Sequence, residues 1–288
     1  MKILVTGATG KLGSIVVDTL LQTVPAEHLA VSVRNPEKAE GLRARGVDVR
    51  HGDFDQPETL DKAFAGVDRL LIISTDGDND TRIRQHKAAV EAAKRANVGF
   101  IAYTSLGHAD TSPLFLAPVH RATEEAIRQT GIPYSFLRNN WYLENEIGTI
   151  EAVLKGAPWL TSAGSGKVGW AARRDYAQAA AAVLVGDGHE NSIYELSGKP
   201  LTQEELASIL ARVLGREVPV QQVDDDTYAK IMAEAGVPEP VLPILVGIQS
   251  AIREGALEIE SNDFEKLLGR PITPLEEVLR EIVSQAQS

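Results

Sequence analysis

The sequence predicts an α/β fold with a doubly wound parallel sheet. Over the first two thirds of the chain, apolar segments of strand length alternate with amphipathic segments of helical period, and a glycine-rich turn joins the first strand to the first helix. Because crossovers between strands of one sheet are right-handed, this alternation makes the sheet parallel. Ligands of such sheets bind beyond the carboxyl ends of the strands, so the residues that follow each strand are the candidates for function.

The glycine-rich turn follows the apolar segment Ile3-Leu4-Val5. Gly7 is placed to turn the chain out of the strand, Gly10 to let the backbone approach a pyrophosphate, and Gly13 to let the helix pack against the strand. The N-terminus of that helix then points at an anion. The position of the pattern between a strand and a helix favours a dinucleotide over a structural turn and indicates a Rossmann-type fold. The expected contacts come from the whole turn: Gly7, Ala8, Thr9, Gly10, Lys11, Leu12 and Gly13.

The other strands and helices of this sheet are expected in strict alternation. Asp55 is expected to cap the helix near 57–65, with Pro57 in its first turn and Gly66 at its end. Residues 1–150 are therefore expected to form a nucleotide-binding Rossmann domain, whose sheet later segments can complete. The strands are expected at 29–33, 47–51, 69–73, 100–104 and 134–137, and the helices near 37–45, 57–65, 82–96 and 119–129.

The final third of the chain is mainly helical. An alanine-rich helix is expected from Asp175 to Val185 and a strand over 193–196, and the segment 241–246 is unusually apolar. This segment would cover a pocket or form a subunit contact, and both readings stay open. Residues 151–288 are expected to form a smaller substrate-side subdomain, with the pocket at its junction with the sheet.

Two capping boxes are expected in this region. Thr202 with Glu205 opens a helix that ends near residue 214, and Thr273 with Glu276 opens the last helix, with Pro274 at its first position.

Composition excludes several classes of function. The 288 residues include 29 lysines and arginines against 40 acidic residues, a formal net charge of −11, which argues against nucleic acid and anionic membranes as partners. There is no cysteine, so disulfides, thiol catalysis and cysteine-ligated metal are excluded, and no metal site is expected. Since the first strand begins at Lys2 and no apolar run is long enough to span a membrane, a cytoplasmic protein is expected.

Arg34 follows the second strand, 21 residues beyond Gly13. An acidic residue at this position binds the ribose of NAD, whereas a guanidinium pairs with the 2′-phosphate of NADP. The sequence therefore favours NADPH as the cofactor of residues 1–150. A solvated surface arginine is the alternative.

Polar residues at the ends of the later strands are candidate cofactor contacts. Asp53 and Phe54 would lie beside the adenine, although Asp53 is equally explained as a turn residue. Ser74 and Thr75 would lie near the middle of the cofactor. The nicotinamide end would be bordered by Tyr103, Thr104, Ser105, Arg138 and Asn139.

Four motifs carry a family resemblance: the opening turn, Val33-Arg34-Asn35-Pro36, Ala102-Tyr103-Thr104-Ser105 and the stretch 134–142. Together they resemble the NmrA-like, atypical short-chain dehydrogenases/reductases, and within them the bacterial NAD(P)H:quinone oxidoreductases and triphenylmethane reductases. The resemblance covers the whole chain. It implies hydride transfer from NADPH to a quinone or a similar conjugated aromatic acceptor, with reduction of a triphenylmethane dye or non-catalytic NADP(H) sensing as alternatives, and it leaves a homodimer open.

The chain departs from the pattern of the superfamily at its acid pair. In ordinary members, this pair is a tyrosine and a lysine four residues later, which give a proton to a carbonyl group. The matching positions here are Leu116 and His120. Reduction of a simple ketone needs a proton donor, whereas a quinone yields a phenolate that collects its proton from water, and a cationic dye needs no proton. His120 stays a catalytic candidate, as a modest acid or a ribose contact, with a helix histidine of no catalytic role as the alternative.

The substrate pocket is expected around aromatic and amide side chains that follow the strand over 134–137. The aromatic rings would wall an aromatic acceptor, and packing between domains is the alternative. The candidates are Asn140, Trp141, Tyr142, His108 and Trp170.

Overall fold

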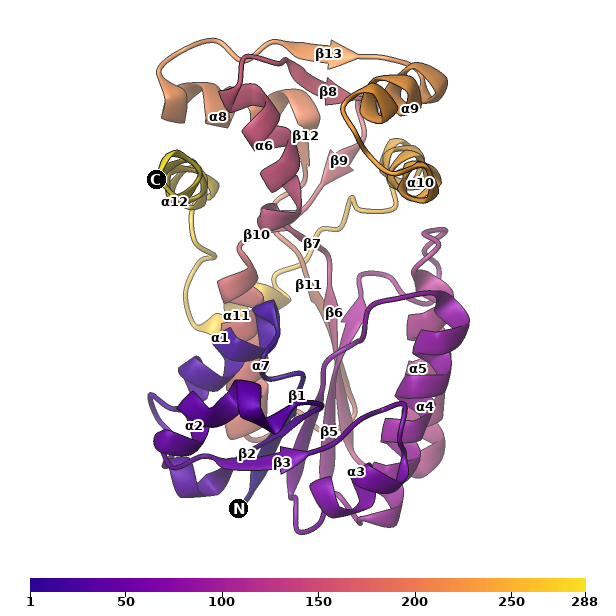
Figure 1. Cartoon of the computed structure of the whole chain (residues 1–288), viewed down its shortest axis with the longest axis vertical. Helices are drawn as coiled ribbons and strands as arrows, with labels where there is room; N and C mark the ends of the chain where they lie inside the picture. The colour runs from indigo at the N-terminus through magenta and orange to yellow at the C-terminus, as the bar shows by residue number, and fades with distance from the viewer.

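A parallel sheet of seven strands forms the lower half of the molecule in Figure 1, a computed structural model that describes all 288 residues. Its strand order is β11-β6-β5-β4-β1-β2-β3. The chain reverses direction across the sheet between β1 and β4, where doubly wound folds bind their ligands. The strands are β1 (Ile3–Thr6), β2 (Leu29–Val33), β3 (Asp48–His51), β4 (Arg69–Ile72), β5 (Phe100–Leu106), β6 (Tyr134–Asn139) and β11 (Ser192–Leu196).

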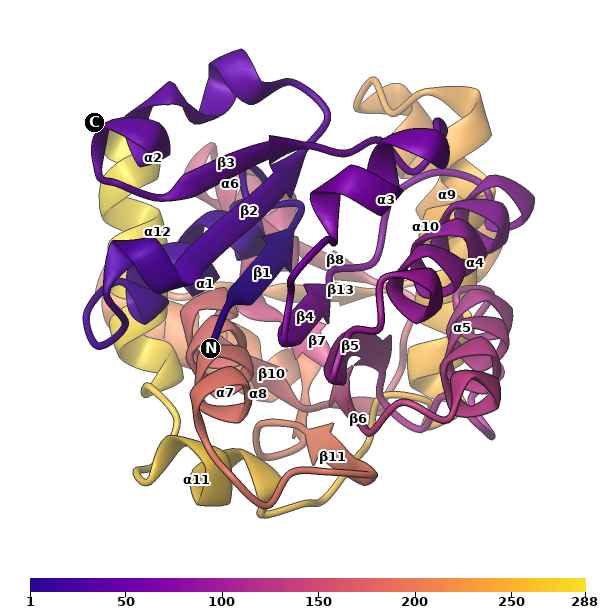
Figure 2. The same ribbon diagram turned by 90° about the horizontal axis from the view of Figure 1, so that it is seen from below.

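Helices cover both faces of this sheet (Figure 2). The sheet is buried on both sides because each helix layer forms an apolar core with it. One layer holds α1 (Lys11–Leu20), α2 (Glu40–Ala44) and α7 (Arg173–Val185), and the other holds α3 (Glu58–Ala63), α4 (Asn79–Arg95) and α5 (Ala117–Thr130). Short 3-10 helices, η1 (Ala26–His28) and η2 (Pro36–Ala39), flank β2. The predicted fold class is confirmed.

The seventh strand and the helix before it come late in the chain. β11 pairs in parallel with β6, and α7 packs beside α1. β11 and α7 are therefore the later segments that complete the sheet. Because the chain returns to the sheet after residue 150, a boundary at that residue does not divide the chain into two continuous domains. We call β1–β6, β11 and their helices the sheet unit.

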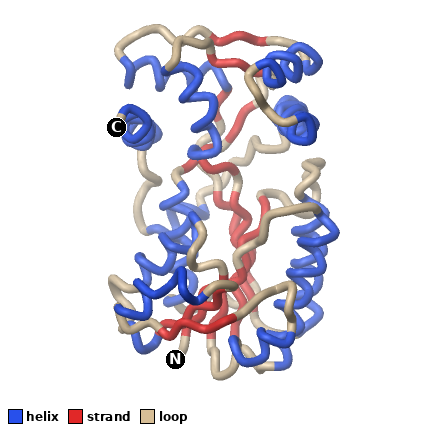
Figure 3. Tube along the Cα trace, viewed as in Figure 1, coloured by secondary structure: helices blue, strands red, loops and turns tan.

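The rest of the chain forms a second, mainly helical unit, seen in the upper half of Figure 3. Trp159 and Trp170 are fully buried in its core. Its strands form pairs: β7 (Trp141–Tyr142) with β10 (Trp170–Ala171), β9 (Lys167–Val168) with β12 (Leu201–Thr202), and β8 (Trp159–Thr161) with β13 (Val220–Gln222). Its helices are η3 (Leu143–Glu146), α6 (Ile147–Leu154), α8 (Gln203–Leu214), α9 (Asp225–Glu234), η4 (Glu239–Val241), α10 (Leu242–Arg253) and α12 (Leu275–Gln287), while α11 (Asp263–Leu268) packs on α7 and β11.

Of the predicted helix caps, the box of Thr202 and Glu205 is confirmed by both of its hydrogen bonds. The predicted cap at Asp55 is wrong, because its carboxylate accepts hydrogen bonds from Arg84 and Gln85 of α4 instead.

The box of Thr273 and Glu276 is also wrong. Thr273 donates from its N–H and its hydroxyl to the buried carboxylate of Asp175, and α12 begins at Leu275 without a side-chain cap. In both cases, the polar side chain forms hydrogen bonds with a distant part of the chain and not with the backbone of the helix that it was predicted to cap. No helix is long and apolar enough to cross a membrane.

Candidate functional site

The turn after β1 has the geometry of a phosphate cradle. Gly7 has φ +60°, in the left-handed region, and a Cβ on Gly13 would overlap the carbonyl oxygen of Gly7. Gly10 precedes α1 in an extended conformation, with no side-chain cap on the helix. The N–H groups of the first helical turn, Lys11, Leu12 and Gly13, make no hydrogen bond within the protein. Unpaired N–H groups at a helix N-terminus, beside a turn kept free of side chains, fit a pyrophosphate.

The side chains of this turn divide between the core and the surface. Ala8 and Leu12 are buried in the core between α1 and the sheet, so only their backbone can face a ligand. Thr9 and Lys11 are exposed. Lys11 is therefore the one cationic side chain that the turn itself offers to an anion.

Arg34 is exposed directly after β2 and makes no hydrogen bond or ion pair with the protein. Its neighbour Asn35 starts η2 by accepting a hydrogen bond from the N–H of Glu37. Hydrogen bonds from Arg84 and Gln85 hold the pKa of Asp55 below its usual value, and the charge of Arg34 adds to this effect. The guanidinium thus lies on the binding edge of the sheet, uncommitted to any carboxylate.

Asp53 and Phe54, which follow β3, have structural roles. The carboxylate of Asp53 accepts a hydrogen bond of 2.9 Å from the N–H of Asp55, which makes it a turn residue. Phe54 is half-buried against the core beneath α3 and α4. Of the two interpretations of Asp53, the structure favours the turn.

Ser74 and Thr75 lie in the loop after β4, at the point where the strand order reverses. The N–H of Ser74 donates to Thr104 Oγ1 and that of Thr75 to His86 Nε2, each over 2.9 Å. Ile73, one residue earlier, lies 3.6 Å from the position of a Cβ on Gly7. The loop that carries Ser74 and Thr75 therefore lies beside the cradle, and their contact with the middle of the cofactor stays a prediction.

The side chain of Tyr103 is not free to contact the nicotinamide, and this expectation is corrected. Its ring is fully buried between β5 and the helices α4 and α5, and its hydroxyl lies 2.7 Å from His120 Nδ1. His120 is itself buried, and burial, followed by the charge of Arg82, lowers its pKa to about 3. A histidine that is neutral at pH 7 carries no spare proton, so His120 does not replace the missing acid pair as an imidazolium.

A second buried histidine, His86 of α4, was not predicted from the sequence. Its Nδ1 lies 2.9 Å from Thr123 Oγ1 on α5, and its Nε2 accepts from Thr75. Burial and then the charge of Arg82 lower its pKa to about 3 as well. The imidazole therefore connects the loop after β4 to α5 in a fixed tautomer.

Ser105 and Arg138 are held by a buried ion pair, which corrects their assignment as cofactor contacts. Arg138 donates to both oxygens of Glu124, over 3.0 and 2.9 Å, and also to Glu195 and Asp110. Ser105 donates to Glu124 over 2.6 Å. Burial alone lowers the pKa of Arg138, but the hydrogen bonds and charge of Glu124, and then Glu195, raise it overall. We call Ser105, Glu124, Arg138 and Glu195 the buried ion-pair cluster.

The amides after β6 have different environments. Asn139 donates to the hydroxyl of Tyr142 over 3.2 Å, and its Oδ1 is buried without a partner. Asn140 donates to Ser197 and to the carbonyl oxygen of Leu257, which ties β6 to the chain between the two units. Asn139 and Asn140 therefore each keep a buried amide oxygen free, while the donor of Asn140 is used by the fold.

Of the aromatic candidates, the assignment of Trp170 to the substrate pocket is corrected, while Trp141 and Tyr142 stay candidates. Trp170 is fully buried, and its Nε1 donates to Glu146 over 3.0 Å. Trp141 and Tyr142 are half-buried where the two units meet, with Arg173 5.4 Å above the ring of Tyr142. His108 is exposed, with φ +50°, and its N–H donates to Glu195. Trp141, Tyr142 and His108 thus remain available to a substrate.

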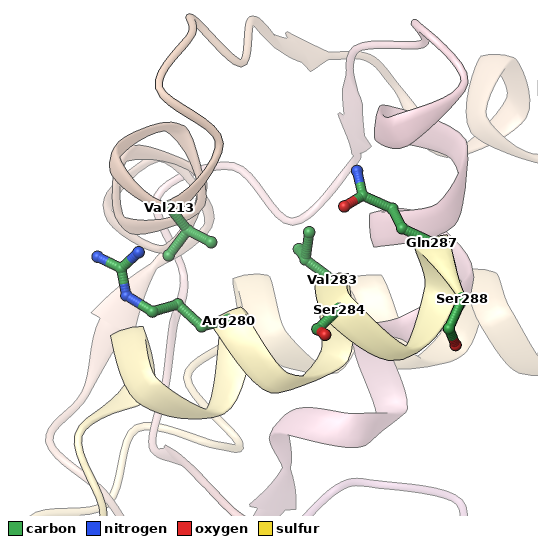
Figure 4. A pocket seen from close by; sticks show the side chains of 6 residues that line it. All are labelled: Val213, Arg280, Val283, Ser284, Gln287 and Ser288. Carbon is green, nitrogen blue, oxygen red and sulfur yellow. The ribbon is translucent and has the colours of Figure 1, made fainter.

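A separate surface pocket lies between α8 and α12 (Figure 4). It contains none of the strand-end residues and no aromatic ring, so it does not belong to the candidate site. It is lined by Val213, Arg280, Val283, Ser284, Gln287 and Ser288.

Comparison with known proteins assigns the family. The model of the NmrA-like family matches residues 1–274. The chain belongs to the NmrA-like family. It is 41% identical over 276 residues to quinone oxidoreductase 2 of Escherichia coli strain K12, with 96% of each chain covered. The resemblance inferred from the motifs is confirmed.

Two solved structures are similar to this chain over nearly its whole length. Triphenylmethane reductase of Citrobacter sp., complexed with NADP(H), has a TM-score of 0.93 at 45% identity, covering 98% of this chain and 100% of that one. The NADPH-dependent quinone oxidoreductase of Escherichia coli, complexed with NADPH, has a TM-score of 0.93 at 40% identity, covering 98% and 99%.

Proposed function

We propose that this protein is an NADPH-dependent oxidoreductase that transfers hydride to a quinone or a similar conjugated aromatic acceptor. The observation that carries the proposal is the cradle at Gly7 to Gly13, with unpaired N–H groups and the uncommitted guanidinium of Arg34 at the same edge of the sheet. Relatives of 40% identity or more are named as NADPH-dependent quinone oxidoreductase and triphenylmethane reductase, which supports it.

The residues present fit NADPH. Lys11, Leu12 and Gly13 would bind the pyrophosphate through their N–H groups, and Arg34 would bind the 2′-phosphate. Ser74 and Thr75 would border the middle of the cofactor, and the free acceptor of Asn139 fits a carboxamide or a ribose hydroxyl. When bound, the reduced nicotinamide supplies a hydride.

The acceptor class follows from the side chains that the site lacks. Leu116 cannot donate a proton, and His120 is neutral and bonded to Tyr103. An acceptor whose reduced form is a stable anion or a neutral molecule needs no protein acid. A quinone is of the first kind and a cationic triarylmethane dye of the second, so dye reduction is the second candidate. Trp141 and Tyr142 supply apolar surface for either ring system.

We also propose a cytoplasmic location and a small aromatic substrate, with neither nucleic acid nor membrane as partner. The charge of −11 supports this. A homodimer stays a hypothesis, tested by sedimentation of the purified chain.

The direct test is NADPH oxidation by the purified protein with menadione as acceptor. We expect steady turnover. Gly10→Val tests the cradle, because Gly10 has an extended backbone that valine also adopts, and the new Cβ would make a close contact of 3.2 Å with the carbonyl oxygen of Gly7, inside the cradle. The variant should fold with an unchanged circular dichroism spectrum and bind NADPH about a hundredfold more weakly, since several charge-assisted hydrogen bonds are lost. Tight NADPH binding without oxidation by any acceptor would favour a sensor.

Cofactor selectivity should depend on Arg34. Arg34→Ala is expected to weaken NADPH binding by about tenfold to hundredfold and NADH binding little, because the guanidinium gains a charged hydrogen bond only from a 2′-phosphate. Fluorescence titration of both cofactors measures this. Lys38→Ala, an exposed cation in η2, is the control and should leave both affinities unchanged. Equal losses for NADPH and NADH in Arg34→Ala would assign Arg34 to the surface.

A further inference from the structure

Arg82, in the first turn of α4, is a buried cation without a partner. Its side chain makes no hydrogen bond or ion pair, its Nε is fully enclosed, and the residue is only 5% exposed. The other buried arginine, Arg138, is held by three carboxylates. An unpaired buried charge costs folding free energy, and proteins retain such a group where a ligand uses it. Arg82 therefore points to an anionic or electron-rich ligand.

The groups around Arg82 are neutral. Burial, followed by the charge of Arg82, lowers the pKa of His86 and of His120 to about 3, and the same charge acts on the buried hydroxyl of Tyr103. The acidic side chain that acts on it, Asp76, is exposed and forms no ion pair with it. The field of Arg82 is thus not cancelled by a neighbouring carboxylate.

Arg82 lies at the binding edge of the sheet. α4 starts after the loop from β4, and its N-terminus lies beside the start of α5, because Asn79 Nδ2 donates to the carbonyl oxygen of Phe115 over 2.8 Å (Figure 1). Thr75, in the same loop, bonds to His86, one helical turn after Arg82. His120 stands where the superfamily has its lysine. Arg82 therefore places a permanent charge beside the position of the missing acid pair.

We propose that Arg82 binds the acceptor oxygen on which negative charge develops during reduction. The inference rests on the proposed function and assigns the electrostatic part of the reaction to a residue of this chain. A quinone accepts a hydride, which carries two electrons and one proton, and becomes a hydroquinone monoanion. The guanidinium donates hydrogen bonds to that oxyanion, which then takes its second proton from water. NADPH is oxidised to NADP⁺ in the same step.

This role makes the two candidate acceptor classes respond in opposite directions to loss of the charge. A quinone is neutral and becomes an anion, so a fixed cation stabilises its transition state. A triarylmethane dye is a cation and becomes neutral, so no oxyanion forms and Arg82 repels the substrate. This role of Arg82 favours a neutral quinone over a cationic dye as acceptor.

The test compares Arg82→Gln and Arg82→Lys with Arg84→Gln, an exposed arginine two residues further along the same helix. We expect Arg82→Gln to lower kcat with menadione by about a hundredfold to a thousandfold, the usual effect of losing an oxyanion donor, and to leave or increase the rate with malachite green, a cationic dye. Arg82→Lys should retain part of the rate. Arg84→Gln should match the wild type. NADPH affinity should be unchanged in all three.

Two measurements do not depend on turnover. The melting temperature of Arg82→Gln should equal or exceed that of the wild type, because an unpaired buried charge is removed. The pKa of 4-nitrophenol bound to the NADP⁺ complex should be lowered in the wild type and not in Arg82→Gln, because Arg82 stabilises the phenolate.

Several results would overturn the proposal. Equal losses with menadione and malachite green, or weaker NADPH binding, would make Arg82 a cofactor contact. A lower melting temperature with an unchanged menadione rate would make it structural. If the wild type reduces no quinone, the proposed function fails, and the shift of the bound nitrophenol then decides whether Arg82 receives an anion.

Discussion

Replacement of Arg138 by leucine should lower the free energy of unfolding by about 3 to 5 kcal/mol, the cost of leaving a buried charge without its partner. Glu124 is only 2% exposed and accepts two hydrogen bonds from Arg138. Without the guanidinium, this carboxylate keeps only Ser105 and a looser contact with Arg128 at 3.5 Å. Urea unfolding at pH 7 measures the loss.

An exposed pair of the same chemistry is the control. Arg95 and Asp61 lie 2.8 Å apart on α4 and α3, and both are about half exposed. Arg95→Leu should cost less than about 1 kcal/mol, because water screens and solvates both charges. The double variant Arg138→Leu with Glu124→Leu should recover part of the loss, since it removes the uncompensated carboxylate. A loss below about 1 kcal/mol in Arg138→Leu would show that the buried ion-pair cluster adds no more than a surface pair.

The buried ion-pair cluster also connects the fold to the site. It joins β5, β6 and β11 through Ser105, Arg138 and Glu195, and Glu195 in turn accepts the N–H of His108. His108 begins the loop that leads to α5. Arg138→Leu should therefore loosen this loop as well as lower stability.

The cradle was predictable because its signal is local. Glycines at fixed offsets between a strand and a helix have few structural explanations, and Gly13 packs against Gly7 as that pattern requires. The exposed position of Arg34 at the binding edge was also predictable, since it depends on following β2 and not on the direction of a strand's side chains.

The errors at Tyr103 and Arg138 have one physical cause. Every residue of β5 is buried, so the strand shows no alternation of apolar and polar residues that would indicate its faces. Neighbouring side chains in a strand point to opposite faces, and a polar residue at a strand end is as easily directed into a helix layer as into the ligand site. Thr104 bonds to the loop after β4, while Tyr103 points at α4 and α5.

The missed residues, Arg82 and His86, do have a sequence signal. They precede Ala89, Val90 and Ala93 at helical spacing, so they continue the buried face of α4 with polar residues. Polar groups on a buried helix face need partners or a function. Neither residue lies at a strand end, where the candidate site was predicted.

Acid should destabilise this protein well above the range in which carboxylates titrate. His86 and His120 have their pKa lowered to about 3 by burial first and then by the charge of Arg82, whereas the ordinary value is 6.5. Between these values the unfolded chain binds protons that the folded protein does not, so the free energy of unfolding falls as pH drops from 6.5 toward 3. From pH 7 to pH 5 the loss should be about 2 kcal/mol for each histidine, or about 4 kcal/mol together.

Urea unfolding at pH 7 and pH 5 tests this, with His120→Asn to isolate one histidine. Asparagine is neutral and keeps a polar atom near the position of Nδ1 for Tyr103. Between pH 7 and pH 5, the free energy of unfolding of this variant should therefore fall by about half as much as that of the wild type. His51→Asn, at an exposed position of β3, should behave as the wild type. Burial raises the pKa of Glu146, which favours folding as pH falls, but this effect is common to all three proteins and cancels in the comparison. If wild type and His120→Asn lose equal stability, His120 titrates as freely in the folded protein as in the unfolded chain.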